Sequence, residues 1–342
     1  MTNIFQQQIW TQEFIDRAED LLAALLSREN LPGDGICAQC TEHRFAIWRC
    51  KDCTLSPALC HTCMRQCHLN NPLHCIECWT GTYFHSADLW EVGVYLLIKH
   101  QGEELECRSL SWQKESLEWL QLSKDDEEQR RLSASQTSSN SVPTAPPTAR
   151  NPDQSEEEWE EDDTELDSIV GYLGDPTTRG ADDCPRQDAL NNHYVRVVHV
   201  NGIHHIALVT CLCHGAETVH GDLMYHQLVP TTFSRYRTLF TVAVLDDFRM
   251  SNLECKASAY QYFQKLHQVT FPMALARAPN LYQELLRMAR VWRWLKKKKW
   301  AGHGHRSGDF TQTAPGELAN FCPACPQPGV NLPSNWKNDP NM

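Results

Sequence analysis

The sequence of 342 residues predicts an α+β fold, in which a small cysteine-rich module is joined by a polar linker to a β-hairpin and several helices. Three observations predict it. Four Cys-x-x-Cys pairs lie between residues 37 and 78, a segment too short to bury a core of its own. A stretch rich in Ser, Pro and acidic residues follows, and beyond it two β-branched runs flank an Asn-Gly dipeptide. The expected segments are an N-terminal helix (1–29), the cysteine module (30–100), the linker (101–183), the second domain (184–335) and a tail (336–342).

The N-terminal segment has an apolar stripe at helical spacing. Within residues 4–28, Glu13 and Arg17 lie opposite that stripe, which predicts an amphipathic helix docked on the cysteine module. The stripe is formed by Trp10, Phe14, Leu21, Leu22 and Leu25. Further on, we expect a short helix over residues 60–69 and another over the apolar stretch 79–98, packed against the module.

The spacing of the cysteines predicts two Zn²⁺ ions. Each Cys-x-x-Cys turn directs two thiolates to one point, and two such pairs complete a tetrahedral zinc site. The N-terminus has no secretion signal, so a reduced, intracellular protein is expected and disulfides are not favoured. In the expected cross-brace, the first and third pairs hold one ion: Cys37, Cys40, Cys60 and Cys63. The second pair and two histidines hold the other: Cys50, Cys53, His68 and His74. Spacing alone leaves four rival ligands open: His43, Cys67, Cys75 and Cys78.

The charge of the chain is concentrated in the linker. Residues 151–168 carry ten acidic residues and no base, against a net charge of −12 for the chain, so the remainder is nearly neutral. With few apolar residues to bury, residues 125–180 are expected to be disordered. The longest apolar run, at residues 92–98, is too short to cross a bilayer, and no membrane association is expected.

The second domain begins with a predicted β-hairpin. The runs 193–200 and 203–211 are rich in β-branched residues, and Asn201-Gly202 between them is typical of a type I′ turn. Strands are also expected at residues 223–229 and 239–245. Helices are expected at 246–269 and 280–299.

Two further cysteine pairs lie far apart in the second domain. Cys211-x-Cys213 ends the hairpin and Cys322-x-x-Cys325 lies near the C-terminus, and together they would complete a third zinc site. In the alternative interpretation, Cys211 and Cys213 are the buried end of a strand, and Cys184, His214 or a partner absent from this sequence completes the site of Cys322 and Cys325.

A basic helix is predicted near the end of the chain. Residues 287–306 contain eight Lys or Arg and no acid, which is typical of a surface that neutralises DNA phosphates. A merely solvated face is the alternative. The four-lysine run also indicates nuclear import. No phosphate-binding loop or catalytic motif is found, and no small-molecule substrate is expected. The expected DNA contacts are Arg287, Arg290, Arg293, Lys297 and Lys298.

Several motifs resemble a known family. Trp48-Arg49-Cys50-Lys51-Asp52-Cys53, Leu228-Val229-Pro230-Thr231-Thr232 and the CPxCPxPGxNLP run of residues 322–333 resemble the cysteine cluster associated with Kyakuja-Dileera-Zisupton (KDZ) transposases. The resemblance covers nearly everything except residues 103–182. It implies a zinc-binding, DNA-associated module on the N-terminal side of a cut-and-paste transposase.

In that family the acidic residues of the RNase H-like catalytic core follow the CPxCPxPG element. The sequence here ends at Met342, so we expect a binding module without its own catalytic core. The interleaved ligands also resemble B-box and ZZ zinc domains. That resemblance implies the alternative function, a protein-interaction adaptor of the ubiquitin pathway or of chromatin.

Overall fold

The computed structural model describes residues 12–31, 35–40, 44–54, 57–101, 107–137, 185–271 and 279–303, with four isolated positions beyond. The fold is a mixed α+β fold with cysteine clusters, as predicted from the sequence. The chain divides into a larger unit, Met1–Val244 with Phe263–Asn280, and a smaller unit, Leu245–Tyr262 with Leu281–Met342. None of the helices in the described ranges is long and apolar enough to cross a membrane.

A three-stranded antiparallel sheet forms the cysteine-rich part of the larger unit, in the order β1-β2-β3. Side chains alternate along β1, so that Trp48 and Cys50 are buried while Arg49 points to the other face. There Arg49 Nε donates to Glu77 Oε2 at 2.7 Å, directly across the ladder. The strands are β1 (Trp48–Cys50), β2 (Ile76–Trp79) and β3 (Phe84–Ala87).

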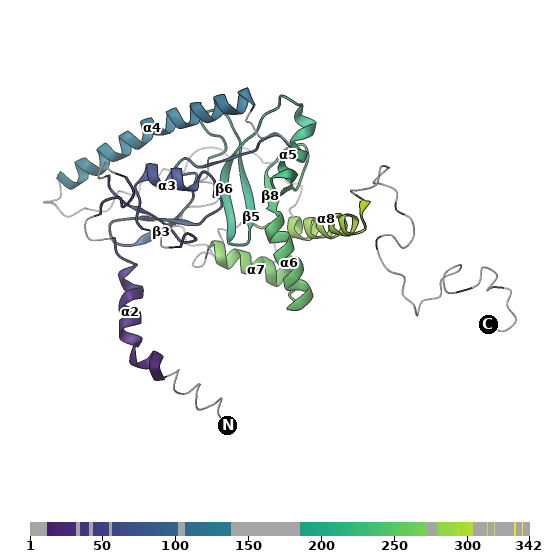
Figure 1. Ribbon diagram of the computed structural model, residues 1–342, viewed down its shortest axis with the longest axis horizontal. Helices are drawn as coiled ribbons and strands as arrows, with labels where there is room; N and C mark the ends of the chain where they lie inside the picture. The colour runs from purple at the N-terminus through teal and green to yellow at the C-terminus, as the bar shows by residue number, and fades with distance from the viewer. Residues whose placement is uncertain are drawn as a thin grey trace, which may run out of the picture. The chain divides into compact units, whose positions relative to one another are not determined.

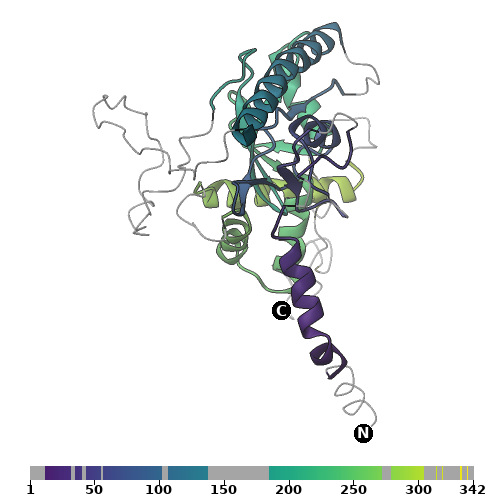
Figure 2. The same cartoon turned by 90° about the vertical axis from the view of Figure 1, so that its left-hand side faces the viewer.

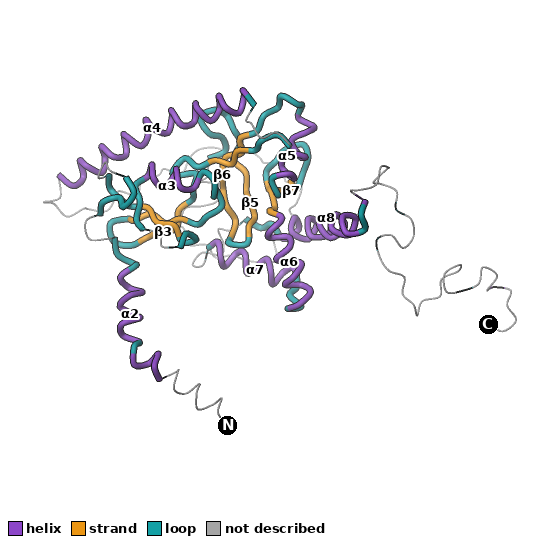
Figure 3. The backbone as a smooth tube through the Cα atoms, viewed as in Figure 1, coloured by secondary structure: helices purple, strands orange, loops and turns teal. Residues whose placement is uncertain are grey.

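The larger unit also contains a five-stranded mixed sheet, in the order β4-β6-β5-β8-β7 (Figures 1 and 3). The β5–β6 and β7–β8 pairs are antiparallel, whereas β4–β6 and β5–β8 are parallel. The strands are β4 (Tyr95–Leu97), β5 (Tyr194–His199), β6 (Gly202–Val209), β7 (Leu228–Pro230) and β8 (Thr238–Thr241).

The predicted hairpin is present, but its turn differs from the prediction. The ladder pairs His199 with Gly202, so the two residues of the loop are Val200 and Asn201. A type I′ turn at Asn201-Gly202 would need both of these residues inside the loop. Here Gly202 is already paired, with φ of 137°, and a Cβ at this position would lie 3.1 Å from Thr270 Oγ1.

The helices lie largely where the sequence predicts them, with a break at residues 255–258. Three predictions of secondary structure are wrong in whole or in part. Residues 79–98 form strands and turns instead of a helix, because Gly81 and Gly93 adopt positive φ angles that break it. Of residues 223–229, the first three end a helix, and only residues 228 and 229 lie in a strand. The strand expected at residues 239–245 ends at Thr241, and a helix begins at Val242. The helices are α2 (Ala18–Ser27), α3 (His61–His68), α4 (Arg108–Thr137), η3 (Ala216–Thr218), α5 (Val219–Tyr225), α6 (Val242–Glu254), α7 (Ala259–Thr270) and α8 (Tyr282–Trp300).

Helix α2 does not bury the predicted apolar stripe. No residue of this helix is buried, and Phe14 before it is also exposed. The guanidinium of Arg49 donates hydrogen bonds to the carbonyl oxygen of Arg28 and, at 2.9 Å, to Glu29 Oε2. The attachment is therefore polar and lies just beyond the helix.

Helix α4 occupies residues that the sequence assigns to the linker. It lies beside α3, to which Asp125 is hydrogen-bonded through Thr62 and Arg65 (Figures 1 and 2). Near the start of α4, Gln113 Nε2 donates to Thr210 O, directly after β6. The predicted disorder of residues 125–180 is therefore wrong for 125–137, which are helical. Residues 138–184 lie outside the described part of the chain.

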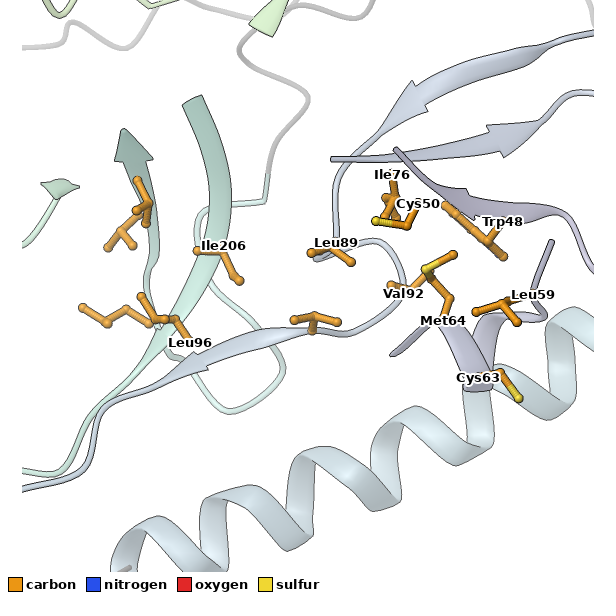
Figure 4. Packing of buried hydrophobic residues seen from close by; sticks show 14 of the residues in the cluster. Trp48, Cys50, Leu59, Cys63, Met64, Ile76, Leu89, Val92, Leu96 and Ile206 are labelled. Atoms are coloured by element: carbon orange, nitrogen blue, oxygen red, sulfur yellow. The ribbon is translucent and has the colours of Figure 1, made fainter. Parts of the chain in front are cut away.

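One hydrophobic core joins the two sheets. It contains Trp48 and Met64 of the cysteine-rich part together with Leu96 and Ile206 of the five-stranded sheet (Figure 4). Val92, fully buried, lies in the chain between them. Residues on both sides of position 100, where the sequence predicts a domain boundary, belong to this one core. They meet because β4 pairs with β6 and not with the strands that precede it in the sequence.

Candidate metal centres

Cluster 1 consists of four cysteines from the first turn of the module and the start of α3: Cys37, Cys40, Cys60 and Cys63. Their sulfur atoms all lie within 4.8 Å of one another, and Cys40 Sγ is 4.0 Å from Cys60 Sγ. A tetrahedral Zn²⁺ ion with Zn–S bonds of about 2.3 Å holds its sulfurs about 3.8 Å apart. The cluster therefore has the spacing of a metal site before any ion is added.

The backbone around cluster 1 favours a thiolate at Cys37. Cys37 N–H donates to Arg44 O at 2.8 Å, which closes the turn that carries the first pair. Cys60 lies at the N-cap of α3 and Cys63 in its first turn. Burial raises the pKa of Cys60 to about 11 and also raises the pKa of Cys63. Burial raises the pKa of Cys37, but hydrogen bonds from backbone N–H groups, that of Cys60 first, outweigh it and lower the pKa to about 7.

Cluster 2 consists of two cysteines at the end of β1 and two histidines from α3 and the loop before β2: Cys50, Cys53, His68 and His74. Cys53 Sγ lies 3.5 Å from His68 Nε2 and 3.4 Å from His74 Nδ1. Cys50 Sγ lies 3.6 Å from His74 Nδ1. The edge between sulfur and nitrogen in a tetrahedral zinc site is about 3.5 Å, so these distances fit the ion.

His68 is oriented for ligation by its second nitrogen. Its Nδ1 lies 2.9 Å from the carbonyl oxygen of Met64, which makes Nδ1 the donor and leaves Nε2 free to face the thiols. Burial lowers the pKa of His68, so the ring is neutral at pH 7, the form that binds metals. Burial raises the pKa of Cys50 to about 12.

Helix α3 supplies ligands to both clusters, so the two candidate centres depend on each other. Cys63 faces cluster 1, and His68 faces cluster 2 from the last turn of the same helix. The structure thus brings together the eight predicted ligands in the two predicted groups. Metal binding at either cluster would help to order the helix that the other requires.

The rival ligands point elsewhere, as far as the structure describes them. Cys67 Sγ donates to Gln39 Oε1, and Cys75 Sγ to Asn201 O. Cys78 Sγ lies 3.8 Å from Trp79 O. The fourth rival, His43, lies outside the described residues.

Asn201, in the loop between β5 and β6, is hydrogen-bonded to the loops that carry the ligands of cluster 2. Asn201 Nδ2 donates to Asp52 Oδ2 and to Leu73 O, both at 2.8 Å. The same carboxylate oxygen of Asp52 accepts the backbone N–H of Cys75 at 2.6 Å. Asp52 lies between Cys50 and Cys53, so Asn201 holds both loops that present the ligands of this cluster.

Cys211 and Cys213 come together with residues that the sequence analysis did not select. Cluster 3 consists of these two cysteines with His100 and Cys107, whose ligand atoms also lie within 4.8 Å of one another. The predicted partners, Cys322 and Cys325, lie outside the described residues, as does Cys184. His100 and Cys107 carry no spacing signal, since neither belongs to a Cys-x-x-Cys pair.

Four of the five predicted DNA-contacting residues are exposed on α8: Arg287, Arg290, Arg293 and Lys297. The fifth predicted residue, Lys298, is not on the exposed face of the helix. Lys298 is buried, 8% exposed, and its Nζ lies 4.5 Å from the ring centre of Trp294. The face opposite the arginines packs inside the smaller unit, where Trp292 Nε1 donates to Asp246 Oδ1 at 2.9 Å.

The comparison with known proteins identifies a class of domain for the middle of the chain. Residues 173–273 match the family described as "CxC2 like cysteine cluster associated with KDZ transposases". This match confirms the resemblance to KDZ-associated cysteine clusters for that segment, which contains Cys211 and Cys213 but not clusters 1 and 2. No curated protein and no solved structure matches the chain.

Proposed function

We propose that this chain is a zinc-organised module that binds DNA through the basic face of α8. Clusters 1 and 2 each offer four Cys or His ligands at tetrahedral spacing, a donor set that suits Zn²⁺. With all four positions taken by protein side chains, such an ion organises the fold and does not activate water. The ions would stabilise the larger unit, which contains most of the family-matched segment.

The exposed basic face of α8 is the observation that carries DNA binding. Arg290 and Lys297 lie two turns apart on the solvent side, with Arg287 and Arg293 beside them. The stretch from Leu285 to Trp300 contains no acidic residue. A helix that presents only positive charge in this way releases counterions when it contacts phosphates, so its affinity depends on salt.

A salt titration of DNA binding tests this proposal. We would measure fluorescence anisotropy of a labelled duplex with the zinc-loaded full chain between about 50 and 200 mM salt. Each lost phosphate contact lowers the slope of log K against log salt by about 0.9. The variant Arg290→Gln/Lys297→Gln should therefore lose nearly two units of slope and bind at least about tenfold more weakly at the lowest salt.

The matched control removes two exposed arginines from the turn before β8, Arg235→Gln/Arg237→Gln, and should leave the slope unchanged. Absence of duplex binding at the lowest salt refutes the proposal. An equal loss of slope in the control variant places binding elsewhere and refutes the role of α8.

Nuclear localisation is part of the same proposal, and it rests on the lysine run. In residues 296–299, Lys297 and Lys299 are exposed, whereas Lys296 pairs with Asp246 Oδ2 at 2.9 Å. Replacing Lys297 and Lys299 by Gln in a fluorescent fusion should shift the protein to the cytoplasm. A fusion that stays nuclear assigns import to another segment.

The shared α3 of clusters 1 and 2 favours a second candidate function, recognition of a protein segment by a cross-braced zinc module. The test is binding of a purified partner that Cys53→Ser abolishes and Arg290→Gln/Lys297→Gln leaves unchanged. The reverse pattern would assign that partner to α8 and refute this second function.

A further inference from the structure

We infer that cluster 3 is a third metal centre, in which Cys107, His100, Cys211 and Cys213 bind a thiophilic divalent cation of the Zn²⁺ class. The four ligand atoms lie within 4.8 Å of one another, the same limit that clusters 1 and 2 meet. A set of three thiols and one imidazole is a common donor set of structural zinc sites. The proposed ligands replace the pairing of Cys211 and Cys213 with Cys322 and Cys325 that the sequence predicts.

The parallel pairing of β4 with β6 explains why these residues meet. Leu97 lies beside Val209 in the ladder, and Ile98 N–H donates to Val209 O at 3.0 Å. The two strands therefore end at the same edge of the sheet. His100 follows the end of β4, and Cys211 follows the end of β6. These two ligands follow directly after paired strands, which fixes their positions more precisely than a long loop would.

The other two ligands approach from neighbouring backbone. Cys107 directly precedes α4, and the carbonyl oxygen of Cys107 accepts the N–H of Ser111, so this cysteine is fixed to the first turn. Cys213 lies two residues beyond Cys211, and its N–H is 3.3 Å from Cys211 Sγ. A backbone N–H directed at sulfur is the usual support of a metal-bound thiolate.

His100 has the second partner that a metal-bound histidine needs. Its Nδ1 lies 3.1 Å from Asp222 Oδ2, and the other oxygen of Asp222 accepts the N–H of Gln101 at 2.7 Å. Both side chains are buried. The carboxylate fixes the ring so that Nε2 faces the thiols, 2.9 Å from Cys213 Sγ. This carboxylate–histidine arrangement orients ligands in many zinc sites.

A different chemistry would use the same three groups. Cys213, His100 and Asp222 are aligned like the nucleophile, base and orienting acid of a cysteine hydrolase. Such a nucleophile needs no further thiols, yet Cys107 and Cys211 both lie within ligand distance of His100. Four convergent ligands favour the metal centre, and the two chemistries predict opposite reactivity for Cys213.

Metal counting on the full chain tests the inference. Native mass spectrometry should find three zinc ions per chain, and two in Cys107→Ser and in His100→Ala. Cys255→Ser is the control, since Cys255 is an exposed free cysteine outside all three clusters, and should keep three ions. Cys322→Ser/Cys325→Ser should also keep three. If that double variant loses one ion and Cys107→Ser does not, the inference is overturned in favour of the sequence prediction.

Thiol labelling of the wild-type chain gives an answer even if a variant fails to fold. With zinc present, iodoacetamide should modify Cys255 at least about tenfold faster than Cys213, although both are exposed. A chelator should remove the difference. If Cys213 reacts as fast as Cys255 or faster in the zinc-loaded protein, it is a free nucleophile and cluster 3 is not a metal centre.

Discussion

Replacing Asp125 by alanine should destabilise the larger unit by about 3–5 kcal/mol. Asp125 lies on α4 with its side chain 1% exposed, and it accepts both bonds of Arg65 Nη1, at 3.0 and 2.9 Å. Thr62 Oγ1 donates to the same carboxylate at 2.8 Å, and His61 Nδ1 lies 2.6 Å from it. Removal of Asp125 leaves the guanidinium of Arg65, 6% exposed, buried without its counter-charge. That unpaired charge is the source of the loss.

The assay is urea unfolding of the zinc-loaded chain, with the free energy of unfolding compared between variants. Glu118→Ala, an exposed acid on the same helix, is the matched control and should change this free energy by less than about 0.5 kcal/mol. The apolar pair Arg65→Met/Asp125→Leu should recover most of the stability, because no charge is then left unpaired. A loss below about 1 kcal/mol, or a double variant as unstable as Asp125→Ala, would refute the reasoning.

Three other perturbations follow from the structure. Met64→Ala removes a fully buried side chain from the core that the two sheets share. The free energy of unfolding, measured in urea, should fall by about 2–5 kcal/mol. A smaller loss would mean that the neighbouring side chains close the cavity. Gly93→Ala should lower the free energy of unfolding by about 1–3 kcal/mol, because φ is 77° and the added Cβ would lie 2.3 Å from Gln121 Cδ. In the control Gly81→Ala the added Cβ meets nothing within 4 Å, so only the strain of the positive φ should lower the stability. Burial and, to a smaller extent, the neighbouring thiolate raise the pKa of Cys50 to about 12, so zinc must displace a proton there. Chelator competition should therefore show the zinc affinity falling by about tenfold or more per pH unit between about pH 7.5 and 6, and a pH-independent affinity would contradict this.

The spacing of residues predicted the features that depend on local geometry. A Cys-x-x-Cys turn places two sulfurs together whatever the rest of the fold does, which is why the eight ligands of clusters 1 and 2 could be selected in advance. The helix over α3 and the hairpin of β5 and β6 are also local, and both are present.

The features that the sequence did not predict depend on contacts between distant residues. His100 and Cys107 carry no motif. The parallel pairing of β4 with β6 brings His100 to Cys211, and Cys107 joins them from the start of α4. Asp125 lies in a polar stretch that resembles the linker in composition. Its burial becomes favourable only because Arg65 and Thr62 on α3 are positioned to meet it.

The pairing of β4 with β6 also decides which fragments of this protein can be studied. A fragment limited to the family-matched residues 173–273 would omit β4 and leave one side of β6 without its partner strand. Ile206, Ala207, Leu208 and Val209 would then form an uncovered apolar edge, the kind of surface that pairs with other chains and aggregates. A soluble fragment of the five-stranded sheet must therefore begin before Tyr95, although the recognisable domain begins far downstream.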